Sequence, residues 1–306
     1  MELRVLRYFL AVAREQNITR AAETLFLAQP SLSRQMQLLE REVGQPLFVR
    51  GKRTITLTEA GKLLKKRAEE ILDLYEKTQT DLMATANDVE GEIYIGGGES
   101  HAFQTIAEAA TALQRDYPGI RFRFFSGDAK TIVERLDKGL IDFGVTVDLA
   151  DLTRYESIRL PLTDRWGVLM PADSPLARQD CLTPNDLKKL PLICSRQSLR
   201  PGSRLLQWFG DDIRRIDVRA TYNLLYNASL LVKAGLGYAV GLDRLINTKD
   251  TALCFRPLSP ALTTHLDLVW KQQGALSRPA TLFLTYLKQK KDLTDPSSDQ
   301  NDSAID

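Results

Sequence analysis

The chain has 306 residues, of which 43% are hydrophobic and 26% are charged, and its formal net charge is +2. This balance excludes a disordered protein, and the length is typical of two or more packed domains. No apolar run reaches the roughly 20 residues of a membrane helix and the N-terminal segment lacks a signal-peptide pattern, so we expect a cytoplasmic protein with no membrane partner.

Charge is distributed unevenly along the chain. Residues 1–65 carry eleven basic and six acidic side chains, a net charge of +5, whereas residues 292–306 hold five aspartates and no lysine or arginine. The basic segment favours a surface that binds phosphates. The acidic tail, residues 292–306, is predicted to be disordered.

Three helical patterns fill the first 44 residues. The first runs from about residue 2 to 15, with one apolar stripe at Leu3, Leu6, Leu10 and Ala13. Asn17 and Thr19 are candidate N-caps for a short second helix, RAAETLF. The third begins near Pro30, a residue suited to a first turn, and ends at Gly44, a natural C-cap.

The third helix is predicted to have two different faces. One stripe should be buried, and it consists of Leu32, Met36, Leu39 and Val43. The opposite side has no Asp or Glu and displays Pro30, Ser33, Arg34, Gln37 and Arg41. Arginine can bond a guanine edge, glutamine an adenine edge and serine either a base or a phosphate. The pattern therefore indicates a helix that enters the major groove, with a solvated surface helix as the alternative.

A short basic hairpin is predicted directly after this helix. Residues 47–50 and 54–57 are β-prone, and Gly51, Lys52 and Arg53 lie between them. Beside a helix-turn-helix, such a hairpin is a wing that lies along the phosphate backbone. Arg50, Lys52 and Arg53 would then position the protein while the third helix contacts bases.

Six motifs in this region resemble the DNA-binding head of LysR-type transcriptional regulators. They are FLAVA, TRAA, QPSLSRQ, LEREVG, PLFVR and LTEAG, and they span nearly 60 residues. The resemblance implies base contacts from Gln29, Pro30, Ser33 and Arg34, and phosphate contacts from Arg50 and Arg53. Phe26 and Leu27 are bulkier than the residues that many members carry near the turn. The complete predicted DNA-binding set is Thr19, Gln29, Pro30, Ser31, Ser33, Arg34, Gln37, Arg50, Lys52 and Arg53.

A long helix is expected to connect the head to the rest of the chain. Thr58 can cap it, and it should run to about Asn87 with a heptad seam at Leu64, Ala68, Ile71, Tyr75, Thr78 and Leu82, where Thr78 is the weak member. We expect self-association, with docking on the adjacent domain as the alternative. The resemblance implies a homodimer, commonly a homotetramer, and hence a partly palindromic operator.

From residue 91 the pattern alternates between strands and helices. EIYIGG, RFRFFSG and LIDFGVTV read as strands, separated by helices near residues 100–116 and 129–138, and a second set follows. This alternation predicts a parallel sheet with helices on both faces. The fold class is therefore α/β with an N-terminal winged helix-turn-helix, and the resemblance implies a two-lobed, periplasmic-binding-protein-like effector domain. The expected domains are residues 1–58 (head), 59–90 (dimerisation helix) and 91–291 (effector domain), with lobe one at 91–161 and 265–291 and lobe two at 162–264.

Loops after the predicted strands are candidate effector contacts, because ligands of open α/β sheets bind beyond the carboxyl ends of the strands. The candidates are Ser100, Gly127, Asp128, Thr146, Ser195, Arg196, Gln197, Tyr222 and Asn223. The resemblance implies that Ser100, Thr146 and Ser195–Gln197 occupy the inducer cleft, and a turn or cap role is the alternative for each residue. Arg196 could pair with a carboxylate, whereas an inward Asp128 would repel one. We expect a small metabolite, with a carboxylate as the favoured group.

Other classes of protein are weakly supported. His101 and His265 form no metal-binding pair, and neither a G-x-S-x-G elbow nor a complete phosphate loop is present, so we expect no enzyme, no metal and no cofactor. Cys181, Cys194 and Cys254 are expected to be buried thiols, with a redox sensor as the alternative. A cytoplasmic solute-binding protein without a transcriptional role, a periplasmic binding protein and an architectural DNA-binding protein are the rivals. The sequence predicts a DNA-binding transcription regulator, with RNA polymerase as a further candidate partner.

Overall fold

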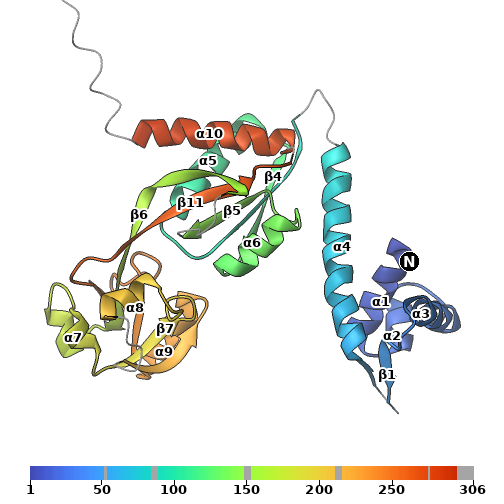
Figure 1. The fold of residues 1–306 in the computed structure, drawn as a ribbon, viewed down its shortest axis with the longest axis horizontal. Helices are drawn as coiled ribbons and strands as arrows, with labels where there is room; N and C mark the ends of the chain where they lie inside the picture. Colours follow the sequence, from blue (N-terminus) through green and yellow to red (C-terminus); the bar gives the residue numbers. More distant parts are fainter. Residues whose placement is uncertain (52–53, 84–88, 148–152, 211–215, 275, 295–306) are drawn as a thin grey trace, which may run out of the picture. The chain divides into compact units, whose positions relative to one another are not determined.

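The computed structural model describes residues 1–306 outside 52–53, 84–88, 148–152, 211–215, 275 and 295–306. The chain divides into two compact units, Met1–Ala84 and Thr85–Asp306 (Figure 1). The predicted acidic tail, apart from its first three residues, lies outside the described residues.

Three helices form the core of the first unit: α1 (Leu3–Glu15), α2 (Ile18–Thr24) and α3 (Gln29–Val43). Phe9, Leu32 and Met36 are completely buried between them. Asn17 caps α2 as predicted, because its side chain accepts hydrogen bonds from the backbone of Thr19 and Arg20. Thr19 therefore does not act as the cap.

Two predicted apolar stripes are partly wrong. In α1 the buried positions are centred on Phe9 and Val12, while Leu3, Leu10 and Ala13 are only half-buried. In α3, Val43 is 37% exposed. Periodicity fixes the direction of a stripe, but the extent of the neighbouring elements decides which of its members are covered.

The predicted wing is a two-stranded antiparallel hairpin of β1 (Phe48–Arg50) and β2 (Ile55–Leu57). The backbone N–H of Gly51 donates to the carbonyl oxygen of Thr54 at 2.9 Å and closes it. Lys52 and Arg53 lie outside the described residues, as does the side chain of Arg50.

The long helix α4 (Glu59–Met83) begins where the sequence predicts, and its expected end near Asn87 lies outside the described residues. The hydroxyl oxygen of Thr58 accepts from the N–H of Gly61 at 3.0 Å and caps the helix. A Cβ atom on Gly61 would lie 2.1 Å from the carbonyl oxygen of Leu47. Only glycine permits this close approach of α4 to the wing, which explains the last residue of LTEAG.

The expected heptad seam of α4 is divided between two environments. Ala68 is completely buried in the core of the first unit, and Leu64 packs against that core. Ile71 and Leu82 are instead exposed, in the company of two leucines outside the predicted seam, Leu63 and Leu74. The head thus covers the first members of the predicted seam, whereas its later members Ile71 and Leu82 stay exposed.

The second unit contains one continuous sheet in the order β4-β3-β5-β11-β6-β9-β7-β8, with β10 paired to β6. Lobe one contains β3 (Gly91–Gly97), β4 (Ile120–Ser126), β5 (Phe143–Val147) and most of β11 (Thr263–Lys271). Lobe two contains β7 (Pro191–Ser195), β8 (Asp217–Tyr222), β9 (Tyr238–Leu242) and β10 (Leu253–Pro257). Strand β6 (Tyr155–Pro171) runs through both lobes, and its first half was not expected.

The sheet is mixed rather than parallel, which corrects the sequence prediction. β3 is parallel to β4 and β5, and β7 is parallel to β8 and β9. β11 is antiparallel to β5 and β6, and β6 is antiparallel to β9 and β10. The alternation of strands and helices predicted the parallel centres correctly, but it did not predict that β6 and β11 run antiparallel to their neighbours.

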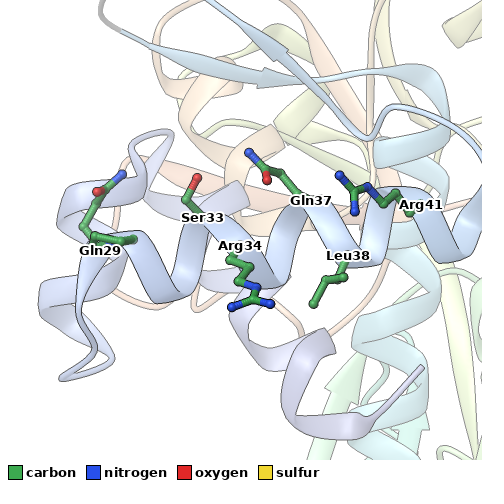
Figure 2. Close-up of a pocket in the computed structure, with 7 residues that line it drawn as sticks. Gln29, Ser33, Arg34, Gln37, Leu38 and Arg41 are labelled. Carbon is green, nitrogen blue, oxygen red and sulfur yellow. The ribbon is translucent and has the colours of Figure 1, made fainter.

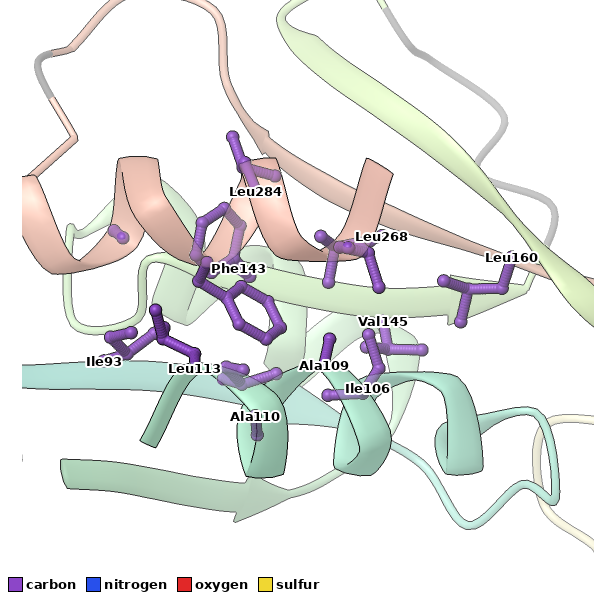
Figure 3. Packing of buried hydrophobic residues seen from close by; sticks show 14 of the residues in the cluster. Ile93, Ile106, Ala109, Ala110, Leu113, Phe143, Val145, Leu160, Leu268 and Leu284 are labelled. Carbon is purple, nitrogen blue, oxygen red and sulfur yellow. The ribbon is translucent and has the colours of Figure 1, made fainter. Parts of the chain in front are cut away.

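Helices cover both faces of each lobe. In lobe one, α5 (Phe103–Asp116) and α10 (Arg278–Thr294) pack on one face, where Ile106, Phe143 and Leu268 are completely buried (Figure 3). Helix α6 (Ala129–Asp137) covers the other face. Lobe two carries η1 (Pro175–Arg178), α7 (Pro184–Leu187), α8 (Arg204–Phe209) and α9 (Leu225–Lys233).

Candidate nucleic-acid interface and effector cleft

The exposed side of α3 forms an open pocket, which we call the α3 face. It is lined by Gln29, Pro30, Ser33, Arg34, Gln37, Leu38 and Arg41 (Figure 2). Five of these residues are the ones that the helical periodicity predicted, and Gln29 came from the resemblance. Leu38 was not expected, and it is 45% exposed.

An acidic residue of the same helix is directed away from this face. The Glu40 carboxylate accepts the backbone N–H groups of Leu47 at 2.8 Å and Phe48 at 3.1 Å. This contact ties α3 to the wing and keeps a negative charge off the α3 face. The result is a polar, cationic surface without a carboxylate among its lining residues, as the sequence predicts.

Among the described side chains, the other predicted DNA contacts do not line the α3 face. Thr19 is exposed in the first turn of α2, and Ser31 is exposed in the first turn of α3 without lining the pocket. Arg50 ends β1.

The turn before α3 separates the two bulky residues that the sequence singles out. Phe26 has a φ of +55° and is 96% exposed, whereas Leu27 packs partly into the core. The N–H groups of Phe26 and Leu27 donate to the carbonyls of Glu23 and Ala22, at 3.1 and 2.8 Å. This is a Schellman C-cap, in which Phe26 occupies the position that usually prefers glycine.

In lobe one, Ser100 is occupied by a contact within the protein. Its hydroxyl donates to Oδ2 of Asp164 at 2.5 Å and accepts from the N–H of Ala102. Asp164 lies on β6 at the junction of the lobes and is 2% exposed. Burial raises the pKa of its carboxyl, while hydrogen bonds from Ser100 and the His101 backbone oppose the rise. Ser100 thus anchors the loop after β3 to the strand that links the lobes.

Thr146 lies near the carboxyl end of β5, and Asp128 follows the carboxyl end of β4, at the same edge of the sheet. Thr146 is 2% exposed, and its hydroxyl oxygen has no hydrogen-bond partner among the described residues. Asp128 caps α6 by accepting from the N–H and hydroxyl of Thr131, at 2.8 and 2.7 Å. Gly127 gives its N–H to the carbonyl oxygen of Gly97. Of these residues, Thr146 is the one with unused hydrogen-bonding capacity.

The predicted effector contacts of lobe two differ in whether their side chains are buried within the lobe or exposed. The hydroxyl of Tyr222 donates to the carbonyl oxygen of Val240 at 2.8 Å, and burial raises its pKa, so it points into its own lobe. Ser195 accepts from the N–H of Ser198. Arg196 and Asn223 are exposed and Gln197 is half-buried. The guanidinium of Arg196 makes no ion pair with a described residue.

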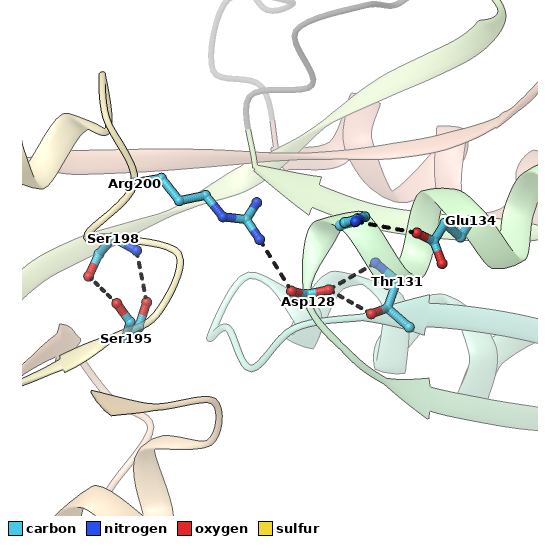
Figure 4. Close-up of polar contacts among 7 residues, drawn as sticks. Asp128, Thr131, Glu134, Ser195, Ser198 and Arg200 are labelled. Carbon is cyan, nitrogen blue, oxygen red and sulfur yellow. Dashed lines mark hydrogen bonds and ion pairs between the residues drawn. The ribbon is translucent and has the colours of Figure 1, made fainter. Parts of the chain in front are cut away.

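Two polar contacts join the lobes across their carboxyl edges. Nη2 of Arg200 lies 3.4 Å from Oδ2 of Asp128 (Figure 4). Oε2 of Glu99 accepts the N–H of Leu225, the first residue of α9, at 2.6 Å. Hydrogen bonds from Thr131, followed by the charge of Arg200, lower the pKa of Asp128. Sequence reasoning missed Arg200 and Glu99, although each lies in a loop that it selected.

The cysteines differ in accessibility. Cys194 is buried, and burial raises the pKa of its thiol to about 12, which makes it unreactive. Cys254 is half-buried, and Cys181 is exposed, contrary to the expectation of a buried thiol. Among the described residues, none of the groups of His, Cys, Asp and Glu could hold a metal ion. No helix in the same residues is long and apolar enough to cross a bilayer.

A winged helix-turn-helix joined to a two-lobed α/β domain defines a ligand-responsive transcription regulator. Family comparison agrees in both parts: "Bacterial regulatory helix-turn-helix protein, lysR family" matches residues 3–62, and "LysR substrate binding domain" matches residues 86–292. The chain belongs to the LysR family of transcriptional regulators, which are not enzymes.

Individual relatives support the same assignment. The chain is 30% identical to the HTH-type transcriptional regulator BudR of Raoultella terrigena, over 89% of this chain and 95% of BudR. It is 34% identical to a probable cat1 operon transcriptional activator of Acinetobacter lwoffii, over 66% of this chain and 67% of that protein. The structure of full-length CbnR with its target DNA shares the fold, with a TM-score of 0.76 at 20% identity, over 95% of this chain and 100% of CbnR.

Proposed function

We propose that the α3 face enters the major groove of an operator and reads its bases. The supporting observation is that cationic and amide side chains line one exposed side of a single helix from which Glu40 is directed away. Arg34 is the strongest candidate for a guanine, and Gln37 for an adenine. Gln29, Pro30 and Ser33 are the remaining base contacts, with Thr19 and Ser31 at the edge of the surface.

The wing is proposed to position the protein on phosphates through Arg50, Lys52 and Arg53. Phosphate contacts add affinity for every duplex and are weakened by salt, whereas base contacts discriminate between sequences. CbnR, which has the same fold, was crystallised with its target DNA. Arg53→Ala should therefore weaken binding to all duplexes and flatten its salt dependence.

The base-reading role is tested by comparing a preferred duplex with a scrambled one. Arg34→Ala should weaken the free energy of binding to the preferred duplex by roughly 1–3 kcal/mol and change binding to the scrambled duplex little. Arg219→Ala is the matched control, because it removes an exposed arginine on β8 of the effector domain. Equal losses of Arg34→Ala on both duplexes would contradict the proposal.

The effector is proposed to bind between the carboxyl edges of the two lobes. Thr146 carries this proposal, because a buried hydroxyl without a partner is rare in folded proteins and has a donor to offer a ligand. Arg196 is exposed without an ion pair and can accept a carboxylate, while the charge of Asp128 is engaged by Thr131 and Arg200. These observations favour a small carboxylated metabolite, with Ser195, Gln197 and Asn223 beside it.

Thr146→Val distinguishes a ligand contact from a structural role. Valine keeps the volume and removes the hydroxyl, so the thermal stability of the free protein should stay constant or rise. Stabilisation by a screened panel of organic acids should decrease. If valine lowers the stability of the free protein, or leaves every acid response intact, Thr146 is not an effector contact.

A second copy of the chain is the proposed partner of α4. The exposed side chains of Leu63, Ile71, Leu74 and Leu82 provide an apolar surface, whereas Ala68 is already buried by the head. A homodimer or homotetramer in the cytoplasm would bind a partly palindromic operator, with RNA polymerase as a further partner. The expected division into residues 1–58, 59–90 and 91–291 stands as part of this proposal.

A further inference from the structure

One residue of the α3 face, Leu38, has no role in the DNA contacts assigned so far. It lines the pocket together with Arg34, Gln37 and Arg41, and 45% of it is exposed (Figure 2). Its exposure contrasts with Leu32 and Leu39 of the same helix, which the core covers almost completely. The α3 face is therefore polar and cationic with a single large aliphatic side chain along its third turn.

The direction of Leu38 follows from its spacing. It is four residues after Arg34, so the two side chains lie on one stripe of the helix, one above the other. Figure 2 shows Arg34 and Leu38 projecting to the same side of α3. A DNA surface that Arg34 contacts therefore also lies within reach of the Leu38 side chain.

In a DNA major groove, the apolar group available to such a side chain is the C5-methyl of thymine. Four residues of helix advance about 6 Å, and stacked base pairs are spaced about 3.4 Å apart, so Leu38 lies within about two base pairs of the base that Arg34 reads. We propose that Leu38 is a specificity residue that contacts a thymine methyl in this position. The inference rests on the proposed DNA-reading role of the α3 face.

The prediction can be tested by removing one methyl group from the DNA. A preferred duplex is selected with the full-length protein from a random library, and each thymine near the guanine assigned to Arg34 is replaced by deoxyuridine. Burying one methyl group corresponds to about a fourfold change in affinity. The wild-type protein should lose about three- to fivefold in affinity at one thymine of each half-site and nothing at the others.

Two protein variants combine with this change in the DNA to form a double-mutant cycle. Leu38→Ala should bind the thymine duplex more weakly than wild type and should no longer distinguish it from the deoxyuridine duplex. Leu230→Ala is the matched control, because Leu230 is 46% exposed on α9 of the effector domain, and it should keep the full sensitivity. Additive losses from the DNA change and from Leu38→Ala would overturn the inference, as would a wild-type protein that ignores every methyl.

The outcomes also separate this inference from the DNA-reading role itself. If Arg34→Ala alters base preference and Leu38→Ala does not respond as predicted, only the role of Leu38 fails. If Arg34→Ala leaves the selected sequence unchanged, the reading role of the α3 face fails as well.

Discussion

The α3 face and the carboxyl edges of the two lobes are both proposed as recognition surfaces, but they are constructed differently. The α3 face comes from one helix, whose core stripe and capping residues fix its orientation. The carboxyl edges of the lobes bring together loops that follow β3, β4, β7 and β8, and many of their polar groups form hydrogen bonds within the protein. The polar side chains of the α3 face are exposed on one helix. Most of the polar side chains in the loops instead form hydrogen bonds that fix the loop conformation.

The largest expected effect comes from the buried side of α3. Leu32 is completely buried, and Leu32→Ala should cost about 2–5 kcal/mol because it leaves a cavity in a small core. Hydrogen exchange of the α1–α3 amides in the full chain should accelerate accordingly. Leu38→Ala, on the exposed side of the same helix, should leave exchange unchanged. Similar acceleration in both variants would contradict the two-faced description of α3.

A smaller effect is expected where the lobes meet. Glu99→Ala should cost about 0.5–2 kcal/mol of stability in the effector domain, because α9 then loses the side chain that caps its first N–H. Exchange of the Leu225 amide reports the loss directly. Glu99→Gln, which keeps an acceptor oxygen, should preserve part of the protection. Unchanged exchange in Glu99→Ala would show that the contact does not hold α9.

The turn before α3 should respond in the opposite direction. Phe26 adopts a left-handed conformation that glycine adopts without strain, so Phe26→Gly should stabilise the head by up to about 1 kcal/mol. Leu27→Gly removes a side chain that packs on the core and should destabilise it. The midpoint of thermal unfolding measures both. A loss of stability in Phe26→Gly would indicate that the exposed ring contributes packing.

The smallest effect is expected from the ion pair between the lobes. Arg200 and Asp128 are 49% and 33% exposed, so Arg200→Ala should cost less than about 1 kcal/mol, and less at high salt. The pKa of Asp128 lies below its ordinary 3.8, so its contribution is present above that pH and is lost as pH falls through the lowered value. The difference in unfolding free energy from wild type should be constant from about pH 5 to 8. A difference that varies across this range would contradict the assignment.

Sequence patterns predicted the α3 face almost completely, because helical periodicity relates neighbours in sequence to neighbours in space. They missed Leu38, since an apolar residue on an exposed face adds to neither the buried stripe nor the polar set. At the carboxyl edges of the lobes, the patterns selected candidate loops but did not predict which residues their side chains would contact. The bonds of Ser100 to Asp164 and of Arg200 to Asp128 join residues more than 60 positions apart, and no local signal carries such information.

The central claim, that Arg34 reads a guanine from the major groove, can be tested by one atomic change in the DNA. Replacing each guanine of the selected duplex by 7-deazaguanine removes the N7 acceptor and leaves base pairing intact. Wild-type protein should lose affinity at one position in each half-site, and Arg34→Ala should be insensitive at that position. Undiminished sensitivity in Arg34→Ala, or a wild-type protein that tolerates every substitution, would contradict the claim.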